Sequence, residues 1–147
     1  MAKSQANVRR LEVVENNLPP LLPESGGFVV KDGLTYAGTH LTIDLWGAKR
    51  LDDLEFIEQT LREAVAATGA TLLRIDLHHF EPNGGVSGVA LLAESHMSIH
   101  TWPERGYAAL DVFTCGTCEP HKAVPILRRA FEPDAVQLNE LKRGLSL

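Results

Sequence analysis

The sequence has little positive charge. Its 147 residues include 14 Lys and Arg against 19 Asp and Glu, for a formal net charge of −5. A nucleic-acid-binding protein normally presents a basic face, so we expect no nucleic-acid partner. No run of about 18 apolar residues is present, and residues 1–17 lack the apolar stretch of a signal peptide. We therefore expect no membrane association and a cytoplasmic location.

Cysteine is also scarce, because the chain has only Cys115 and Cys118. Two cysteines are too few for a disulfide scaffold and suit a reducing compartment. The length predicts one domain that can bury a hydrophobic core. It is small for the large folds that bind pyridoxal phosphate, so demanding chemistry would need a compact cofactor, a metal or a group made from the chain itself.

The first 33 residues differ in composition from the rest. They contain three of the eight prolines, followed by the pair Gly26-Gly27. Proline restricts the backbone and removes a hydrogen-bond donor, whereas glycine loosens the chain. We expect residues 1–33 to form a flexible N-terminal extension and residues 34–147 to form the folded domain.

From residue 34 onward the apolar residues are regularly spaced. Alternation predicts strands at 41–46, 73–77, 107–115 and 135–141, with extended segments at 86–93 and 96–102. Helical spacing predicts one helix from Asp52-Asp53 to Gly69 and another from Pro120 to Phe131, in which Pro125 fits poorly. The resulting order, β-α-β-β-β-α-β, predicts an α+β two-layer sandwich. Both helices would cover one face of a mainly antiparallel sheet.

Reactive side chains concentrate between His78 and Cys118, and they allow a metal or a redox interpretation. Cys115 and Cys118 with His96 and His100 have spacings that zinc accepts, although the histidines fall in a predicted strand. The C-x-x-C sequence also suits a thioredoxin-like redox pair, but too little chain follows it to complete that fold.

A third interpretation starts from residues 93–104, where Glu94 and Ser95 are followed by His100. Together with residues 85–89 and 106–116, this run closely resembles the self-cleavage segment of the small prokaryotic S-adenosylmethionine decarboxylase proenzymes. Weaker similarity extends the resemblance to roughly residues 34–144. The chain is thereby identified as a member of that family.

The resemblance implies that the chain makes its own cofactor. The Ser95 hydroxyl would attack the carbonyl of Glu94, and elimination from the resulting ester would cut the chain between residues 94 and 95. A pyruvoyl group would remain at position 95. Its ketone would form a Schiff base with the amine of S-adenosylmethionine, and the conjugated amide carbonyl would accept the electrons as carbon dioxide leaves. The product would be the aminopropyl donor for spermidine synthesis.

The same resemblance implies roles for three more residues. His100 would be the proton acceptor in processing, Ser87 would assist processing, and Cys115 would donate a proton to the substrate after decarboxylation. Cys118 and His96 receive no role. An odd number of positions separates Ser95 from His100, so a regular strand would place them on opposite faces, and we expect a bend or bulge near Ser95.

On the substrate side, the resemblance implies that Phe80 stacks on the adenine, that Met97 lies beside it and that Glu104 accepts hydrogen bonds from the ribose. We expect Trp102 in the core. The resemblance also implies a homodimer of αβ protomers.

The sequence departs from the family pattern at several places. Thr39 replaces a common basic residue, Glu81 replaces an apolar one, the loop at 116–120 is one residue shorter, and His121 replaces a Trp. A carboxylate such as Glu81 could pair with a cationic substrate, so arginine or ornithine decarboxylation is an alternative. A catalytically dead homologue that regulates a partner is a further one.

Overall fold

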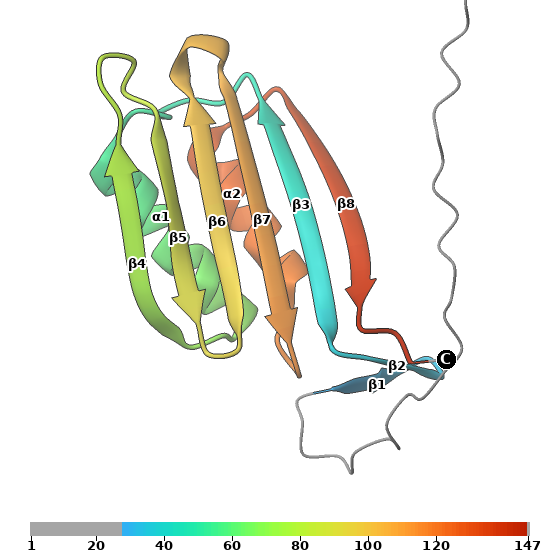
Figure 1. Ribbon diagram of the computed structural model, residues 1–147. Coiled ribbons are helices and arrows are strands. Elements are labelled where there is room, and N and C mark those ends of the chain that lie inside the picture. Colours follow the sequence, from blue (N-terminus) through green and yellow to red (C-terminus); the bar gives the residue numbers. More distant parts are fainter. Residues whose placement is uncertain (1–27, 147) are drawn as a thin grey trace, which may run out of the picture.

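A six-stranded antiparallel sheet with two helices packed against one face forms the body of the protein (Figure 1). The computed structural model describes residues 28–146. The strand order in the sheet is β4-β5-β6-β7-β3-β8. These elements are β3 (Gly38–Trp46), α1 (Leu54–Thr68), β4 (Leu72–His79), β5 (Val86–Leu92), β6 (Ser95–Trp102), β7 (Tyr107–Cys115), α2 (Ala123–Phe131) and β8 (Ala135–Arg143). The predicted two-layer α+β sandwich is confirmed.

The predicted element order was one strand short between the helices. Four strands, β4 to β7, lie there rather than three, and each pairs with the next along the chain. The two extended segments at 86–93 and 96–102 are separate strands, because a tight turn at Ala93 and Glu94 reverses the chain between them.

The first helix begins and ends at capping residues, and the second begins three residues later than predicted. The Asp53 side chain accepts a hydrogen bond from the Phe56 N–H at 3.1 Å and caps α1, and Gly69 ends that helix with a φ of 82°. A 3-10 turn at Pro120–Lys122 precedes α2. Pro125 is therefore the third residue of α2, where the backbone nitrogen has no partner within the helix, and its predicted poor fit does not arise.

The core lies between the helices and one face of the sheet. Alternate residues of β3, Leu41, Ile43 and Leu45, are completely or almost completely buried. They belong to the same cluster as Ile57 of α1 and Phe131 of α2. The other face of the sheet carries no helix, and we call it the open face (Figure 1).

A small hairpin precedes the sheet. Its strands are β1 (Val29–Lys31) and β2 (Leu34–Tyr36), with positive φ angles at the turn residues Asp32 and Gly33. Ser146 donates a backbone hydrogen bond to Thr35, so the two ends of the described chain meet there. The rest of the predicted extension, residues 1–27, lies outside the described residues.

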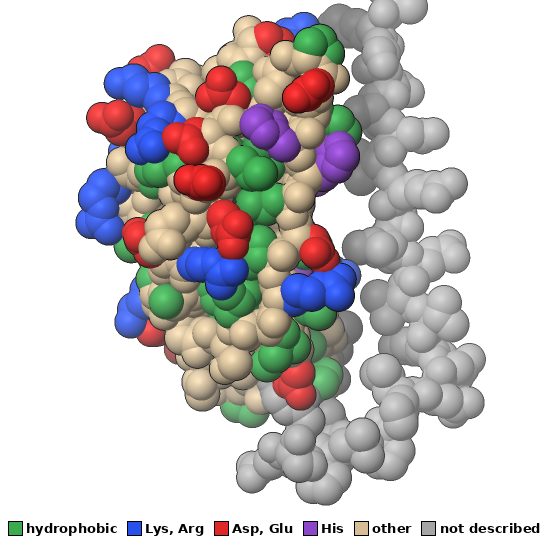
Figure 2. Space-filling view, turned by 90° about the vertical axis from the view of Figure 1, so that its left-hand side faces the viewer, with side chains coloured by type: hydrophobic (Ala, Val, Ile, Leu, Met, Phe, Trp, Pro, Cys, Tyr) green, Lys and Arg blue, Asp and Glu red, His purple; other side chains and the backbone are tan. Residues whose placement is uncertain are grey.

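Neither described helix is long and apolar enough to cross a membrane. On the side of the molecule that Figure 2 shows, basic and acidic side chains are interspersed, so no patch of one sign stands out there.

Replacing Phe131 with Ala should lower the free energy of unfolding by about 3–5 kcal/mol, because the ring is fully buried and packs edge-on against Phe56. Chemical denaturation of both proteins measures the difference. Leu73→Ala is the control: Leu73 is 61% exposed, so its removal should change stability by less than about 0.5 kcal/mol. Equal effects of the two substitutions would contradict the placement of the core.

Candidate active site

Glu94, Ser95 and Cys115 meet at one end of the sheet. Ser95 opens β6 and is buried, and its Oγ accepts a hydrogen bond from the Cys115 backbone N–H at 3.1 Å. The Cys115 thiol donates to the carbonyl oxygen of Glu94 at 3.2 Å. One residue at the end of β7 therefore orients the hydroxyl and also polarises the carbonyl of the peptide bond between Glu94 and Ser95.

Glu94 itself has a strained backbone. Its φ is 61°, in the left-handed region that side chains with a Cβ seldom adopt. This conformation costs about 1–2 kcal/mol. The strain lies at the peptide bond whose carbonyl is polarised and whose following hydroxyl is held in place. Observed strain of this kind concentrates at functional positions, so it supports a reactive role for this bond.

Ser87 and His100 form a second group. They face each other across β5 and β6, and the Ser87 Oγ lies 2.9 Å from the His100 Nδ1. The pairing of β6 with β5 and β7 runs without a register shift, so the bulge expected near Ser95 is absent. His100 consequently faces the open side, whereas Ser95 faces the helix layer. Five residues of strand separate them by about 17 Å.

Two of the three predicted substrate residues lie at the same end of the sheet as Ser87 and His100, and the third lies in the core. Phe80 follows β4 and is 45% exposed beside His78, with ring centroids 4.5 Å apart. Glu104 is exposed in the short helix after β6. Both lie at the end of the sheet that carries Ser87 and His100, which is opposite to the end that carries Ser95 (Figure 1). Met97 is completely buried in the core, which argues against its predicted contact with adenine.

The prediction that Trp102 lies in the core is wrong. It is 38% exposed on the open face and stacks on Tyr107 at 5.2 Å, and Tyr107 stacks in turn on Trp46 at 4.3 Å. Alternation along β6 explains the error, because Trp102 has the same parity as His100 and therefore points away from the helices.

A half-buried carboxylate on the open face was missed by the sequence analysis. Asp111 of β7 accepts hydrogen bonds at its Oδ2 from the Nε2 atoms of His40, at 2.5 Å, and His96, at 2.9 Å, and its other oxygen accepts from Ser98. The strands β3, β6 and β7 bring these side chains together from positions far apart in the sequence. The only sequence signal was that Asp111 interrupts a strand otherwise rich in apolar residues.

His40, His96 and Asp111 offer ligand atoms that lie within 4.8 Å of one another, a spacing that a metal site could use. Arg143 lies 3.2 Å from His40 Nδ1, and a guanidinium can only donate, so Nδ1 is the acceptor in this contact. The Nε2 atom of the same ring is then the one that donates to Asp111. The geometry describes an ordered hydrogen-bond network.

The alternative zinc set does not assemble. His96 and His100 lie four residues apart on one strand, about 13 Å along it, so they cannot bind one ion together. The redox alternative also loses support. Cys115 ends β7 and Cys118 lies in the loop before the 3-10 helix at Pro120–Lys122, so the pair does not open an α-helix whose N-terminus would lower a thiol pKa.

Asp111 should make stability depend on pH. Burial raises its pKa, but the hydrogen bonds from Ser98, His96 and His40 outweigh that effect, so the pKa lies below the ordinary value of 3.8. Stabilisation by the charged carboxylate is therefore complete well above pH 3.8 and is lost as the pH falls through the lowered pKa. Asp111→Asn should cost about 1–2 kcal/mol of unfolding free energy at neutral pH.

The difference between Asp111→Asn and the unmodified chain should shrink below about pH 4. Unfolding free energies measured across the acid range test this. Asp76→Asn is the matched control, because Asp76 is largely exposed beside Arg74 and should give a small difference at every pH. A difference for Asp111→Asn that stays constant with pH would contradict the interpretation.

Known proteins resemble this chain over most of its length. A family model described as S-adenosylmethionine decarboxylase matches residues 39–144. Proteins named S-adenosylmethionine decarboxylase proenzyme from Thermomicrobium roseum and Methanococcus vannielii are each 50% identical to the chain. The alignments cover 74% of this chain and 94% and 90%, respectively, of the two relatives.

A solved structure agrees with the sequence comparisons. The crystal structure of the adenosylmethionine decarboxylase from Aquifex aeolicus superposes with a TM-score of 0.67 at 34% identity, covering 76% of this chain and 94% of that one. The matched region contains the strained Glu94, the buried Ser95 and the Cys115 that contacts both. The chain belongs to the S-adenosylmethionine decarboxylase family.

Proposed function

We propose that the chain is a proenzyme that cuts itself between Glu94 and Ser95 and then decarboxylates S-adenosylmethionine with the pyruvoyl group formed at position 95. The observation that carries the proposal is the position of Cys115. Its N–H holds the Ser95 hydroxyl and its thiol contacts the Glu94 carbonyl oxygen, around a peptide bond strained at Glu94.

The residues present suit formation of this cofactor. Ser95 Oγ is adjacent to the carbonyl carbon it would attack, and hydrogen bonding of the thiol to the carbonyl oxygen favours the negative charge that develops there. Transfer of the acyl group from nitrogen to oxygen would also release the strained conformation of Glu94. The finished group would supply an electrophilic ketone for a Schiff base with the substrate amine, and a conjugated amide carbonyl to take up the electrons released with carbon dioxide.

Cys115 is placed for the later proton donation as well. It is partly exposed at the end of β7 and lies beside position 95, so its thiol can reach a substrate atom held there. A thiol can donate a proton only while it remains protonated, and a free cysteine persists in a reducing compartment. These requirements support the proposed donor role of Cys115 and a cytoplasmic location.

A single chain holds the proposed site in two separate halves. Ser95 and Cys115 lie at one end of the sheet, and Ser87, His100, Phe80 and Glu104 lie at the other. The open face between them carries exposed aromatic and aliphatic side chains, including Trp102, Val89 and Leu91.

Burying two open faces against each other about a twofold axis would bring the two halves together. With the axis running across the strands, one copy's His100 end would then lie over the other copy's Ser95 end, and packed sheets lie only about 10 Å apart. We therefore include in the proposal a homodimer of αβ protomers. Each protomer would consist of the two chains that cleavage between Glu94 and Ser95 produces.

S-adenosylmethionine is favoured over arginine and ornithine as the substrate. The relatives described above carry its name at 50% identity, and the exposed Phe80 offers a surface for a base to stack on. The dead-homologue alternative is not favoured either, because such a protein would be expected to lack Ser95 or Cys115.

Ser95→Ala should abolish cleavage, because the nucleophile is removed. Cys115→Ala should leave cleavage largely intact, since its N–H still holds Ser95, but should lower turnover by about 10²-fold or more through loss of the proton donor. Intact-mass analysis measures cleavage. Carbon dioxide release from S-adenosylmethionine, arginine and ornithine in parallel measures turnover and substrate choice.

Cys118→Ala is the control for both measurements and should behave as the unmodified chain does. An unmodified chain that stays in one piece would overturn the proposed processing. Normal turnover by Cys115→Ala would remove its donor role, and faster release from arginine or ornithine would change the substrate.

The two-copy site can be tested by mixing variants. His100→Ala alone and Ser95→Ala alone should both remain uncleaved. When the two are co-expressed, the His100→Ala chain should be cleaved in mixed dimers, because the end of its sheet that carries the intact Ser95 would lie opposite the His100 end of the other copy. Mass analysis identifies which chain is cut. If the His100→Ala chain stays intact in isolated mixed dimers, His100 does not act across the interface.

A further inference from the structure

Arg143, the last residue of β8, is exposed and has no carboxylate within ion-pair distance among residues 28–146. A guanidinium has five N–H donors, and its Nη1 contacts the Nδ1 atom of His40 at 3.2 Å. The guanidinium carbon also lies 5.8 Å from the centre of the Phe113 ring. The side chain therefore leans from β8 across β3 toward β7, and it keeps most of its donors available for a ligand.

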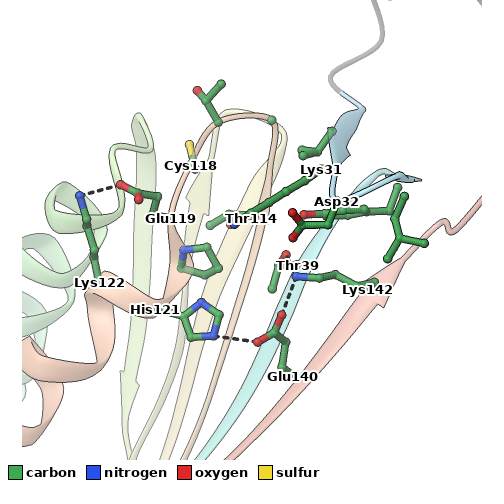
Figure 3. A pocket seen from close by; sticks show the side chains of 16 residues that line it. Lys31, Asp32, Thr39, Thr114, Cys118, Glu119, His121, Lys122, Glu140 and Lys142 are labelled. Carbon is green, nitrogen blue, oxygen red and sulfur yellow. Dashed lines mark hydrogen bonds and ion pairs between the residues drawn. The ribbon is translucent and has the colours of Figure 1, made fainter.

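Two neighbouring cations at this end of the sheet are already paired. Lys142 points to the helix side, where it contacts Glu140 at 2.5 Å, and Lys122 contacts Glu119 at 2.6 Å. Figure 3 shows both ion pairs in the wall of a cavity on that side. Arg143 has the opposite parity to Lys142 along β8, so it faces the open side of the sheet and lies apart from these pairs.

The register of the sheet puts Arg143 in line with Cys115. Both residues pair with Gly38 of β3, one from each side, and both side chains belong to the open face. Two strand spacings separate their Cα atoms by about 10 Å. A Cβ at position 38 would collide with the Thr114 carbonyl oxygen and lie 3.0 Å from the Phe113 ring, so this position requires glycine. No side chain of β3 therefore stands between the guanidinium and the thiol in this row.

A chain of hydrogen bonds orients Arg143. His40 accepts from the guanidinium through Nδ1 and donates through Nε2 to Asp111 at 2.5 Å. The carboxylate of Asp111 also accepts from His96 and Ser98, so both of its oxygens already have donors. The guanidinium is thus held from one side by a network that is satisfied without it. Such support holds a binding group in place before its ligand arrives.

The proposed reaction brings a carboxylate to this place. If Cys115 protonates the carbon from which carbon dioxide leaves, the carboxylate of the substrate is bonded to that same carbon and lies next to the thiol. A planar guanidinium can bind a carboxylate with two parallel N–H···O bonds, and it remains charged at any working pH. Arg143 is the cation in the row of Cys115.

We propose that Arg143 binds the α-carboxylate of the substrate while the substrate amine is joined to position 95, and that His40 is its positioning residue. The assignment rests on the proposed function, and it names the residue that would select amino acids over amines without a carboxylate. As carbon dioxide leaves, the negative charge moves away from Arg143. The contact is consequently strongest with the intact substrate and weaker in the transition state.

Arg143→Gln should raise the KM for S-adenosylmethionine about tenfold or more and leave kcat within about twofold, because the lost contact belongs to the bound substrate. Arg143→Lys keeps the charge but loses the fork, so its KM should fall between. His40→Ala should raise KM in the same way but to a smaller extent. Carbon dioxide release over a range of substrate concentrations measures both constants, after intact-mass analysis has shown cleavage of each variant.

The amine product separates carboxylate binding from a general structural effect. Decarboxylated S-adenosylmethionine has no carboxylate, so its inhibition constant should change by less than about twofold in Arg143→Gln. Arg74→Gln is the matched control, because Arg74 also lies on the open face but at the opposite edge, 2.6 Å from Asp76. Its KM should stay within about twofold of the unmodified chain. With arginine or ornithine as the substrate, the same difference between substrate and amine product is expected.

Four results would overturn the assignment of Arg143: an unchanged KM in Arg143→Gln, an equal weakening of product inhibition, an equal effect of Arg74→Gln, or an Arg143→Gln chain that stays uncut. A normal KM in His40→Ala would remove the positioning role of His40. Absence of cleavage or turnover in the unmodified chain would overturn the proposed function together with this assignment. The two failures are therefore distinguished by which protein shows them.

Discussion

The alternation of side chains along a regular β-strand is the constraint on which the rest of this structure depends. One parity of β6 and β7 builds the core, with Met97, Ile99 and Val112 completely buried. The other parity places His96, His100 and Asp111 on the open face. Since no bulge interrupts β6, residues that are close in sequence are divided between two environments.

This division gives the two faces different surroundings. The Ser95 side chain is buried on the helix side, and the strained Glu94 lies in an exposed turn just outside the regular ladder. The open face can meanwhile hold polar and aromatic groups without disturbing the packing of α1 and α2. The carboxylate of Asp111 shows how this face is organised. It accepts hydrogen bonds from His40 on β3 and from His96 and Ser98 on β6, the two strands that flank β7.

Local patterns were enough to predict most of the elements. Alternation located the strands, and Asp53 and Gly69 marked the ends of α1 because capping is a property of a few adjacent residues. The predictions from sequence were incomplete or wrong where a side chain's surroundings depend on residues far away in the chain. Nothing near Asp111 predicts that His40, 71 positions away, will donate to it, and Trp102 was misplaced because hydrophobicity does not reveal which face of a strand a side chain occupies.

The same limit applies to the candidate site. The motif around Ser95 could be read from adjacent residues, and so could the pairing of Cys115 with this region, because both belong to one matched run. The distance between Ser95 and His100 could not be read in this way, because it depends on whether β6 pairs regularly with its neighbours. A bulge near Ser95 was expected to bring the two residues together. A regular strand instead keeps them about 17 Å apart and on opposite faces.

A bulge would have solved this problem within one chain, but only by breaking the pairing of β6 with both of its neighbours. The proposed homodimer would solve it without that cost. If its twofold axis runs across the strands, the end that carries His100 in one copy would lie over the end that carries Ser95 in the other. The regularity that separates the two halves within a chain would then let two identical chains complete each other.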